Sequence, residues 1–266
     1  MSNSNRTDAP APWLMLLESR ALFELGAISA ASPLLRFAGR GDRHPVLVLP
    51  GFTADDRSTA PLRRVLRSQG YWTHGWRLGR NIGPTQRIVE GMVERLMLLH
   101  ERHGRPVSIV GWSLGGIFAR ELARMQPEAV RQVITLGSPF RMTDQDRSTA
   151  SALYERMSDL HAIDLTEVGA ESDREPLTVP ATAIYTKTDG VVRWWQCLEA
   201  EGPQRENIEV LGSHSGLGFN PSVVFAVSDR LAQPADDWRP FRSPLLLRRF
   251  YPRPSNWREA EATTAA

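Results

Sequence analysis

The sequence predicts an α/β fold in which a mostly parallel central sheet has helices on both faces. Three observations lead to this class. Short apolar runs rich in β-branched residues alternate along the chain with segments of helical period. Of the 266 residues, 41% are hydrophobic, which suffices for one sizeable core rather than two small ones. A glycine-rich turn, Gly111 to Gly116, stands where one apolar run gives way to a helical pattern.

The alternation of the two patterns starts at residue 45. Apolar runs predict strands at residues 46–49, 71–76, 107–110, 130–136, 182–185 and 208–211. Apolar residues spaced by three or four predict helices at residues 61–69, 85–100, 114–125 and 221–231. Thr59 is a candidate N-cap of the first helix and Gly70 its stop, and Pro127 ends the third. Strands interleaved with helices imply βαβ units and therefore a mostly parallel sheet.

The chain before the alternating region has two parts. Residues 1–12 are polar, contain two prolines and are predicted to be disordered. Residues 13–30 read as an apolar-rich helix, too short and too interrupted by Glu18, Arg20 and Glu24 to cross a membrane. We expect its apolar face to pack on the body of the domain; the alternative is that it lies over the mouth of an active site.

Two later segments also break the alternation within and beyond a domain predicted at residues 13–233. Residues 140–180 lack a strong strand pattern, with a helix plausible at 150–161. This insert falls between two strands on the side where active-site loops belong, so it is a candidate small cap or lid. Residues 234–266 contain five prolines and predict an irregular tail that wraps the surface.

Composition argues against several classes of protein. A net charge of +2 is too balanced to imply a nucleic-acid partner. Cys197 is the single cysteine, so no intrachain disulfide can form, and no Cys/His cluster has the spacing of zinc ligands. No run is long enough to span a bilayer, and the first ten residues lack the layout of a secretory signal. We therefore expect a cytoplasmic protein without a metal.

The turn Gly111-Trp-Ser-Leu-Gly-Gly116 has the Gly-x-Ser-x-Gly pattern of a nucleophile elbow. A serine attacks well only if it projects from a sharp turn, close to a base and to free backbone N–H groups. Glycine tolerates the close backbone contacts that such a turn creates. The expected strand precedes the turn and the expected helix follows it, so Ser113 is the candidate nucleophile.

A serine nucleophile needs a histidine base and a carboxylate that orients the imidazole. In folds with this elbow the order along the chain is serine, acid, histidine. His214 is the only one of six histidines in a loop after a late strand, which makes it the candidate base. Asp189 follows the strand at 182–185 and is the candidate acid, with Glu199 and Glu201 as weaker alternatives.

The oxyanion of an acyl-transfer intermediate requires two N–H donors. The N–H of Leu114, directly after the candidate nucleophile, is one candidate. The N–H of Phe52 is the other, because Pro50-Gly-Phe52 ends the first predicted strand. A purely structural Pro-Gly turn is the alternative interpretation of this segment.

Four motifs together resemble the α/β-hydrolase superfamily, and within it bacterial serine esterases and lipases. They are Gly111-Trp-Ser-Leu-Gly-Gly, Thr135-Leu-Gly-Ser-Pro139, Asp189-Gly-Val-Val192 and Ser213-His-Ser-Gly-Leu-Gly218, in family order over residues 45 to about 232. The resemblance implies an α/β-hydrolase fold, Ser113 as nucleophile, Asp189 as acid and His214 as base. It implies no organic or metal cofactor.

The sequence thus favours a serine hydrolase that cleaves carboxylic esters through an acyl-enzyme. Residues beside the motifs suggest an apolar lining for a hydrophobic acyl chain, formed by Phe52, Trp112, Leu114, Phe140, Leu217 and Phe219. A thioesterase or an acyltransferase with the same triad is the alternative, and a non-catalytic hydrolase-like lipid-binding protein is the alternative of a different class.

Residues 241–251 mix apolar, aromatic and basic side chains, as in segments that contact a membrane surface, although packing of this tail on the domain is the preferred interpretation.

Overall fold

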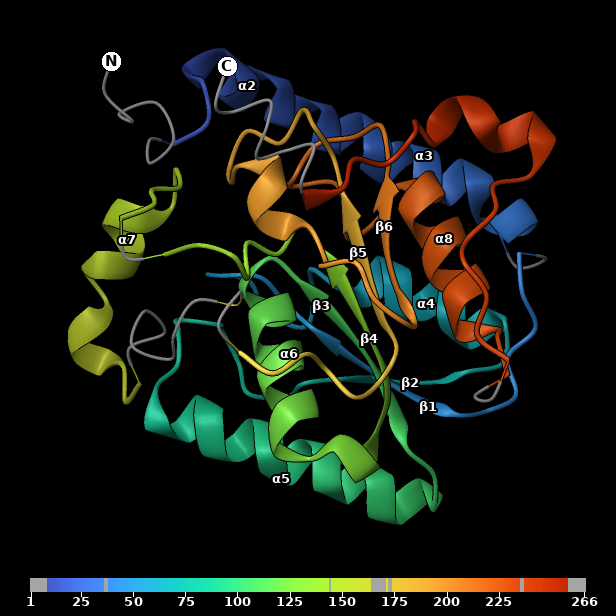
Figure 1. Cartoon of the computed structure of the whole chain (residues 1–266), viewed down its shortest axis with the longest axis horizontal. Helices are drawn as coiled ribbons and strands as arrows, with labels where there is room; N and C mark the ends of the chain where they lie inside the picture. The colour runs from blue at the N-terminus through green and yellow to red at the C-terminus, as the bar shows by residue number, and fades with distance from the viewer. Residues whose placement is uncertain are drawn as a thin grey trace.

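The central feature of the structure, a computed structural model, is a six-stranded sheet in which every pair of neighbouring strands is parallel (Figure 1). The strand order is β2-β1-β3-β4-β5-β6. The structure describes residues 9–35, 38–143, 145–163, 171, 174–234 and 237–257. The predicted parallel α/β class is confirmed.

The strands follow the apolar runs closely at the centre of the sheet and less closely at its edge. They are β1 (Pro45–Leu49), β2 (Trp72–Gly75), β3 (Val107–Trp112), β4 (Val130–Leu136), β5 (Ala181–Tyr185) and β6 (Arg205–Glu209). A strand is present near residues 208–211 as predicted, but its bounds lie earlier, because β6 pairs with β5 from Arg205 and ends at Glu209. As the edge strand, β6 accepts charged and polar residues that an apolar run does not contain.

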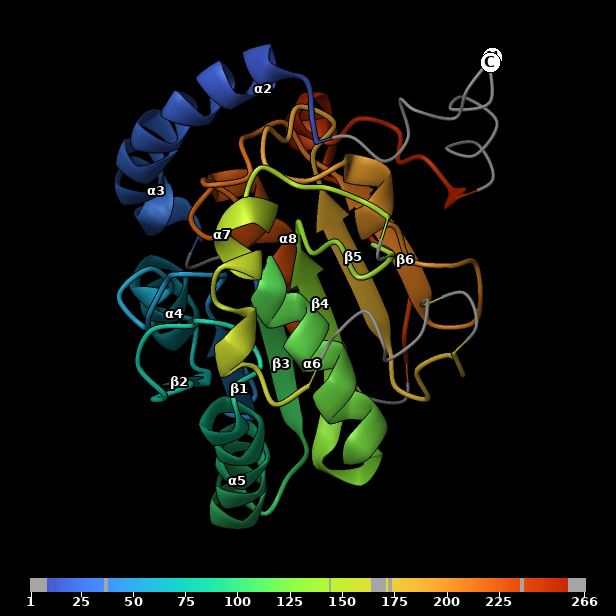
Figure 2. The same ribbon diagram turned by 90° about the vertical axis from the view of Figure 1, so that its left-hand side faces the viewer.

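Helices cover both faces of the sheet, as Figures 1 and 2 show. They are α2 (Pro12–Leu17), α3 (Ala21–Leu35), α4 (Ala60–Ser68), α5 (Gln86–His103), α6 (Leu114–Met125), α7 (Ser151–Glu155) and α8 (Pro221–Leu231). In β1, Val46 and Val48 point into the core shared with α3, α4 and α8, while Leu47 and Leu49 point into the core shared with α5 and α6. This alternation is the two-residue period of a strand buried on both faces.

The N-terminal helical region differs from its prediction in how it contacts the domain. Helix α2 is followed by a 3-10 helix, Glu18–Arg20, and then by α3. The apolar side chains of Leu16 and Phe23 are 76% and 81% exposed, whereas Glu18 is only 8% exposed. The expectation that an apolar face packs on the body holds at Ile28 of α3, which is 3% exposed in the core cluster with α8. It fails at Leu16 and Phe23, because the carboxylate of Glu18 makes the inner contacts there. Residues 1–8, predicted to be disordered, lie outside the described residues.

The insert and the tail are partly described. Helix α7 and a 3-10 helix, Ser158–Leu160, lie within the predicted helical stretch, and residues 164–170 lie outside the described part. The tail is not wholly irregular, because it forms a 3-10 helix, Leu245–Phe250. Phe241 and Phe250 pack against the core cluster that contains α8, and the Tyr251 hydroxyl donates to the Ser222 carbonyl oxygen over 2.7 Å.

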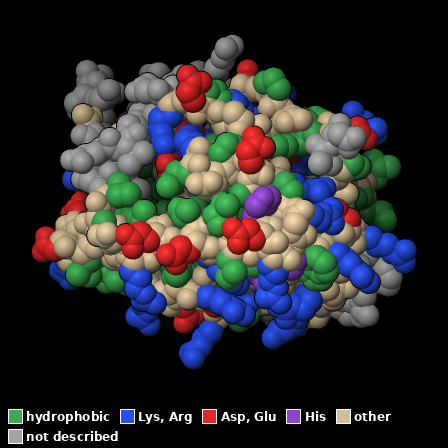
Figure 3. Space-filling view, turned by 90° about the horizontal axis from the view of Figure 1, so that it is seen from below, with side chains coloured by type: hydrophobic (Ala, Val, Ile, Leu, Met, Phe, Trp, Pro, Cys, Tyr) green, Lys and Arg blue, Asp and Glu red, His purple; other side chains and the backbone are tan. Residues whose placement is uncertain are grey.

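Surface features bear on possible partners. None of the described helices is long and apolar enough to cross a membrane. Leu245 and Leu246 in the tail are 86% and 90% exposed. The face seen from below carries basic side chains along one edge and several acidic side chains nearer its middle (Figure 3). Charges of both signs thus occupy this face, in keeping with the balanced composition.

Candidate active site

Ser113 occupies a sharp turn between β3 and α6. Its backbone has φ 52° and ψ −123°, an unusual conformation for a residue with a side chain. A Cβ atom at Gly111 would lie 2.3 Å from the Gly115 carbonyl oxygen and 2.4 Å from the Gly116 Cα. Only glycine fits there, so the spacing of the motif follows from how tightly the strand and the helix approach each other.

Three side chains that are distant in sequence meet at this turn. The Ser113 Oγ lies 3.1 Å from His214 Nε2, and His214 Nδ1 lies 2.6 Å from Asp189 Oδ2. An ionised carboxylate can only accept, so Nδ1 carries the proton and Nε2 is free to accept the hydroxyl proton of Ser113. The sequence-predicted serine, acid and histidine therefore form one continuous chain of hydrogen bonds.

The Asp189 carboxylate is held by its own loop. Asp189 is 3% exposed, and its Oδ1 accepts the N–H groups of Val191 and Val192, each over 2.8 Å. Burial by itself lowers the pKa of the His214 imidazole, but the charge and hydrogen bond of Asp189, together with the charge of Glu18, raise this pKa above its ordinary value of 6.5. The site thus stabilises the imidazolium that forms when histidine takes a proton.

The remaining histidines have hydrogen-bond partners other than Ser113. His44 contacts Asp42 and Ser108, and the rings of His74 and His103 contact each other. The His100 ring lies 3.2 Å from the Arg105 carbonyl oxygen, and the His161 ring 2.9 Å from that of Ile82.

The weaker candidates for the acid, Glu199 and Glu201, do not contact the His214 imidazole. Glu199 forms a buried ion pair with Arg120. Glu201 is exposed on a turn between residues 197 and 205. Asp189 is thus the carboxylate that the structure places at the imidazole.

The two expected oxyanion donors lie on neighbouring segments. Leu114 is the first residue of α6, where an N–H has no partner in a preceding helical turn. The Phe52 N–H makes no hydrogen bond within the described part of the chain. A Cβ at Gly51 would lie 3.2 Å from Ser113 Cβ, so the segment containing Phe52 runs directly beside the serine.

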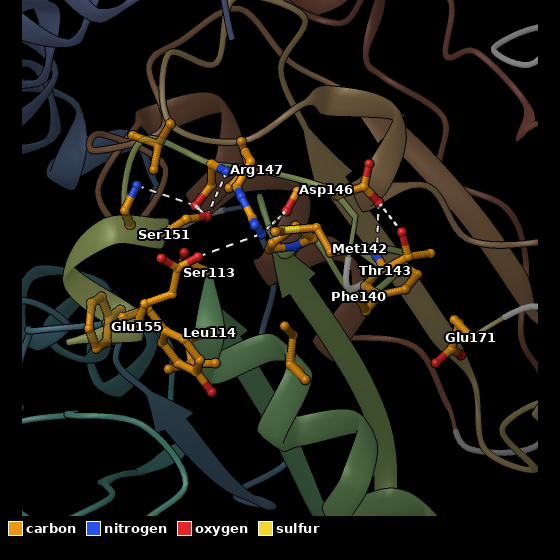
Figure 4. A pocket seen from close by; sticks show the side chains of 18 of the residues that line it. Ser113, Leu114, Phe140, Met142, Thr143, Asp146, Arg147, Ser151, Glu155 and Glu171 are labelled. Carbon is orange, nitrogen blue, oxygen red and sulfur yellow. Dashed lines mark hydrogen bonds and ion pairs between the residues drawn. The ribbon is translucent and has the colours of Figure 1, made fainter. Parts of the chain in front are cut away.

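A cavity of about 370 Å³ opens beside Ser113 (Figure 4). This volume is within the range of small-molecule sites. Its apolar lining comprises Phe52, Leu114, Ile117, Pro139, Phe140, Met142, Val191 and Val192. Side chains of the insert also line it, among them Ser151 and Tyr154 of α7, and Tyr154 packs edge-on against Phe52 at a ring distance of 5.4 Å. The insert therefore forms a wall of the cavity.

Three of the residues expected to bind substrate do not line this cavity. Leu217 is fully buried in the core, and the Trp112 ring packs edge-on against Phe219. The Trp112 Nε1 donates to the His214 carbonyl oxygen over 3.1 Å. They lie outside this cavity because residues close together in a motif point to either side of the strand or loop that carries it. Trp112 contacts the backbone of the loop that carries His214 and packs against Phe219.

Two structural features of the site escaped sequence reasoning. Arg120 is 2% exposed, lies 4.0 Å above the Phe140 ring and pairs with Glu171 and Glu199, so it fixes the position of Phe140. Glu18 reaches the acid and base loops from the N-terminal region. The sequence did offer one indication that Glu18 is special, because it is a carboxylate within an apolar-rich helical segment.

No group of three or more His, Cys, Asp or Glu residues within the described ranges is placed to hold a metal ion. Cys197 is fully buried, and burial raises the pKa of its thiol well above the ordinary value. It is therefore an inert thiol rather than a second nucleophile.

Comparison with known proteins identifies the family. Residues 35–175, more than half of the chain, match the family described as having the alpha/beta hydrolase fold. The chain belongs to this α/β-hydrolase family. No curated protein gave a significant sequence match.

Solved structures with the same fold include lipolytic enzymes of low sequence identity. Lipase B of Aspergillus fumigatus is 16% identical with a TM-score of 0.56, covering 75% of this chain and 55% of that chain. This chain thus spans about half the length of lipase B. A structure from the metagenome-derived lipolytic pair LipS and LipT is 18% identical with a TM-score of 0.55, covering 71% of this chain and 93% of that chain. At such identities the likeness concerns the fold.

Proposed function

We propose that this protein is a serine hydrolase that cleaves carboxylic esters with a hydrophobic acyl chain. The observation that carries the proposal is the hydrogen-bonded chain from Ser113 through His214 to Asp189, with distances of 3.1 Å and 2.6 Å. A hydroxyl that can pass its proton to a base of raised pKa is an activated nucleophile. Ser113, the nucleophile of this triad, lines the cavity.

The reaction proceeds in two steps. Ser113 Oγ bonds to the acyl carbon while His214 Nε2 takes its proton, and the N–H groups of Phe52 and Leu114 stabilise the oxyanion. The imidazolium then protonates the leaving alcohol as the C–O bond breaks, which leaves an acyl-enzyme. Water attacks the acyl carbon, gives a proton to His214, and the acid leaves as Ser113 recovers its proton.

The cavity supports an apolar acyl group. Phe52, Leu114 and Phe140 line it next to the serine, and an alkyl chain that enters it loses contact with water. Each methylene buried contributes about 0.8 kcal/mol. A longer acyl chain should therefore raise kcat/KM until the cavity is filled.

The test compares the wild type with Ser113→Ala on p-nitrophenyl esters from acetate to dodecanoate. We expect Ser113→Ala to lose turnover while its far-UV and near-UV circular dichroism stay unchanged. Ser68→Ala, an exposed serine on α4, is the matched control and should keep wild-type rates. Turnover by Ser113→Ala at the wild-type rate would refute the assignment.

The same substrates can be presented as thioesters and together with an acceptor alcohol. Faster cleavage of the thioester, or acyl transfer in preference to hydrolysis, would reassign the reaction while leaving the triad in place. Preference for the oxygen ester in water supports the proposal as stated.

A further inference from the structure

The carboxylate of Glu18 joins the two loops that carry the acid and the base. Its Oε1 accepts the N–H of Gly190 over 2.9 Å and the N–H of His214 over 3.0 Å, and its Oε2 accepts the N–H of Ser215 over 2.8 Å. Gly190 follows Asp189 directly, so one buried side chain contacts the backbone beside both members of the pair. Loops held in this way cannot separate without leaving a buried carboxylate unpaired.

Two neighbours of Glu18 extend the same connection. Arg20 Nη2 donates to the Thr188 hydroxyl over 3.1 Å and to the Gly212 carbonyl oxygen over 3.0 Å. Glu24 accepts the N–H of Ser213 over 2.9 Å and its hydroxyl over 3.0 Å. Residues 18–24 therefore form a polar bridge across the loops at 188–190 and 212–215.

We propose that Glu18 is a positioning residue of the active site, which sets the distance and orientation between Asp189 and His214. This inference rests on the proposed serine-hydrolase function. Glu18 does not touch Ser113 or the cavity; it acts through the backbone of the two loops. Because Gly190 packs against the Leu14 carbonyl, where an added Cβ would lie 2.6 Å away, the N-terminal segment and the acid loop are in direct contact.

Glu18 also acts on the imidazole through its charge. Burial raises the pKa of the Glu18 carboxyl, but the hydrogen bonds from Ser215, Gly190 and His214 outweigh burial and hold this pKa below 4.5. Glu18 is therefore a carboxylate at neutral pH. Its negative charge favours the imidazolium form of His214.

The other ionisable groups around this pair are few and identifiable. Asp189 contacts His214 directly, and Glu24 and Arg20 bind the segments on either side of it. The Cys197 thiol, which is near Asp189, stays neutral because burial raises its pKa. Loss of the Glu18 charge alone should thus lower the pKa of His214.

A residue that only anchors the N-terminal helix would affect stability without these effects. The two roles separate through three measurements on Glu18→Gln: kcat against KM for an ester substrate, the melting temperature, and the titration of the His214 ring by NMR. Histidine-labelled protein gives the ring signals, and His214→Asn identifies the one required. Glu94→Gln, an exposed glutamate on α5, is the matched control for loss of one charge.

We expect Glu18→Gln to lower kcat by about tenfold or more with KM changed less than about twofold, since the misplaced groups act on the transition state. We expect its His214 pKa to fall by about half a unit or more, so the acidic limb of kcat/KM moves to lower pH. Glu18→Asp, which keeps the charge, should restore most of the His214 pKa and part of kcat. Glu94→Gln should match the wild type in all three measurements.

Equal kcat and equal His214 pKa in Glu18→Gln and the wild type would overturn the proposal. A fall in kcat that follows the folded fraction, with an unchanged His214 pKa, would overturn it as well. If Glu18→Gln does not fold, Gly190→Ala takes its place, because its Cβ pushes the Leu14 segment away from the acid loop. It should show the same two changes, and their absence counts against the proposal.

The titration also separates this inference from the proposed function. It requires no turnover, so a wild-type protein inactive on all esters would refute the proposed reaction while the His214 pKa still reports on Glu18. Conversely, an active enzyme in which Glu18→Gln leaves kcat and the His214 pKa unchanged would refute only the positioning role.

Discussion

Replacing Gly115 by alanine should disable the oxyanion site while leaving the triad chemically complete. Gly115 is the second residue of α6 and faces the end of β1. A Cβ there would lie 2.6 Å from the carbonyl oxygens of both Leu49 and Pro50. Both contacts are with backbone, which cannot rotate out of the way. Either α6 or the segment leading to Phe52 must move.

The size of the effect follows from that distance. Ordinary contact begins at 3.4 Å, so the backbone must yield by about 0.8 Å. The expected donors, Phe52 and Leu114, lie on the two sides of this contact. Removal of one oxyanion donor costs about 10²–10³ in kcat, or roughly 2.7–4 kcal/mol, and a displacement of about 1 Å can cost 10²-fold. We expect Gly115→Ala to lose about 10²-fold or more in kcat.

The assay is hydrolysis of a p-nitrophenyl ester, with the melting temperature measured alongside. Gly51→Ala serves as a graded variant, since its Cβ would meet Ser113 Cβ at a less severe 3.2 Å. Gly26→Ala is the control, because nothing lies within 4 Å of its added Cβ. As an exposed helical position, it should gain up to about 1 kcal/mol of stability and keep wild-type activity.

The expected order of kcat is therefore Gly26→Ala, then Gly51→Ala, then Gly115→Ala. Well-folded Gly115→Ala with a kcat within about twofold of the wild type would show that the β1–α6 contact does not set the oxyanion geometry. A lower kcat for Gly51→Ala than for Gly115→Ala would also contradict the reasoning.

Three other predictions concern the base, the tail and the surface. The raised pKa of His214 places the acidic limb of kcat/KM above pH 6.5, because the base must be neutral; a limb below pH 6 in the pH profile would contradict this. Tyr251→Phe removes a 2.7 Å hydrogen bond to Ser222 and should cost about 1 kcal/mol, lowering the melting temperature by about 2–4 °C, with activity unchanged. If the tail contacts membranes, which is the alternative to the preferred packing on the domain, Leu245→Ser/Leu246→Ser should reduce co-sedimentation with anionic vesicles without altering the melting temperature. Equal sedimentation of both proteins argues for packing alone.

The parts of the molecule that depend on local sequence were predictable. The apolar run before Ser113 and the helical spacing after it gave α6 at residues 114–125, as observed. The loop after β5 and the loop before α8 were identified by position, and the structure brings Asp189 and His214 from those loops to Ser113. Parallel strands end at one edge of a sheet, so residues that follow them meet there.

Contacts between distant segments were not predictable in the same way. Glu18 appeared as an interruption in an apolar helix, yet its carboxylate accepts three backbone N–H groups. Trp112 and Leu217 belong to the motifs, yet neither lines the cavity. Which side a residue faces depends on the direction of the strand or loop in space, and apolar character alone does not give that direction.

Local sequence patterns were enough to predict the alternation of strands and helices, the sharp turn at Ser113 and the chain order of the three candidate catalytic residues. These features depend on periodicity and on glycine at fixed spacing, which act over a few residues. The identity of the side chains that line the cavity, and of the segment that joins the loops of Asp189 and His214, became known from the three-dimensional fold. Those outcomes depend on packing and hydrogen bonds between residues as far apart as Glu18 and His214, where a buried carboxylate must find donors wherever the fold supplies them.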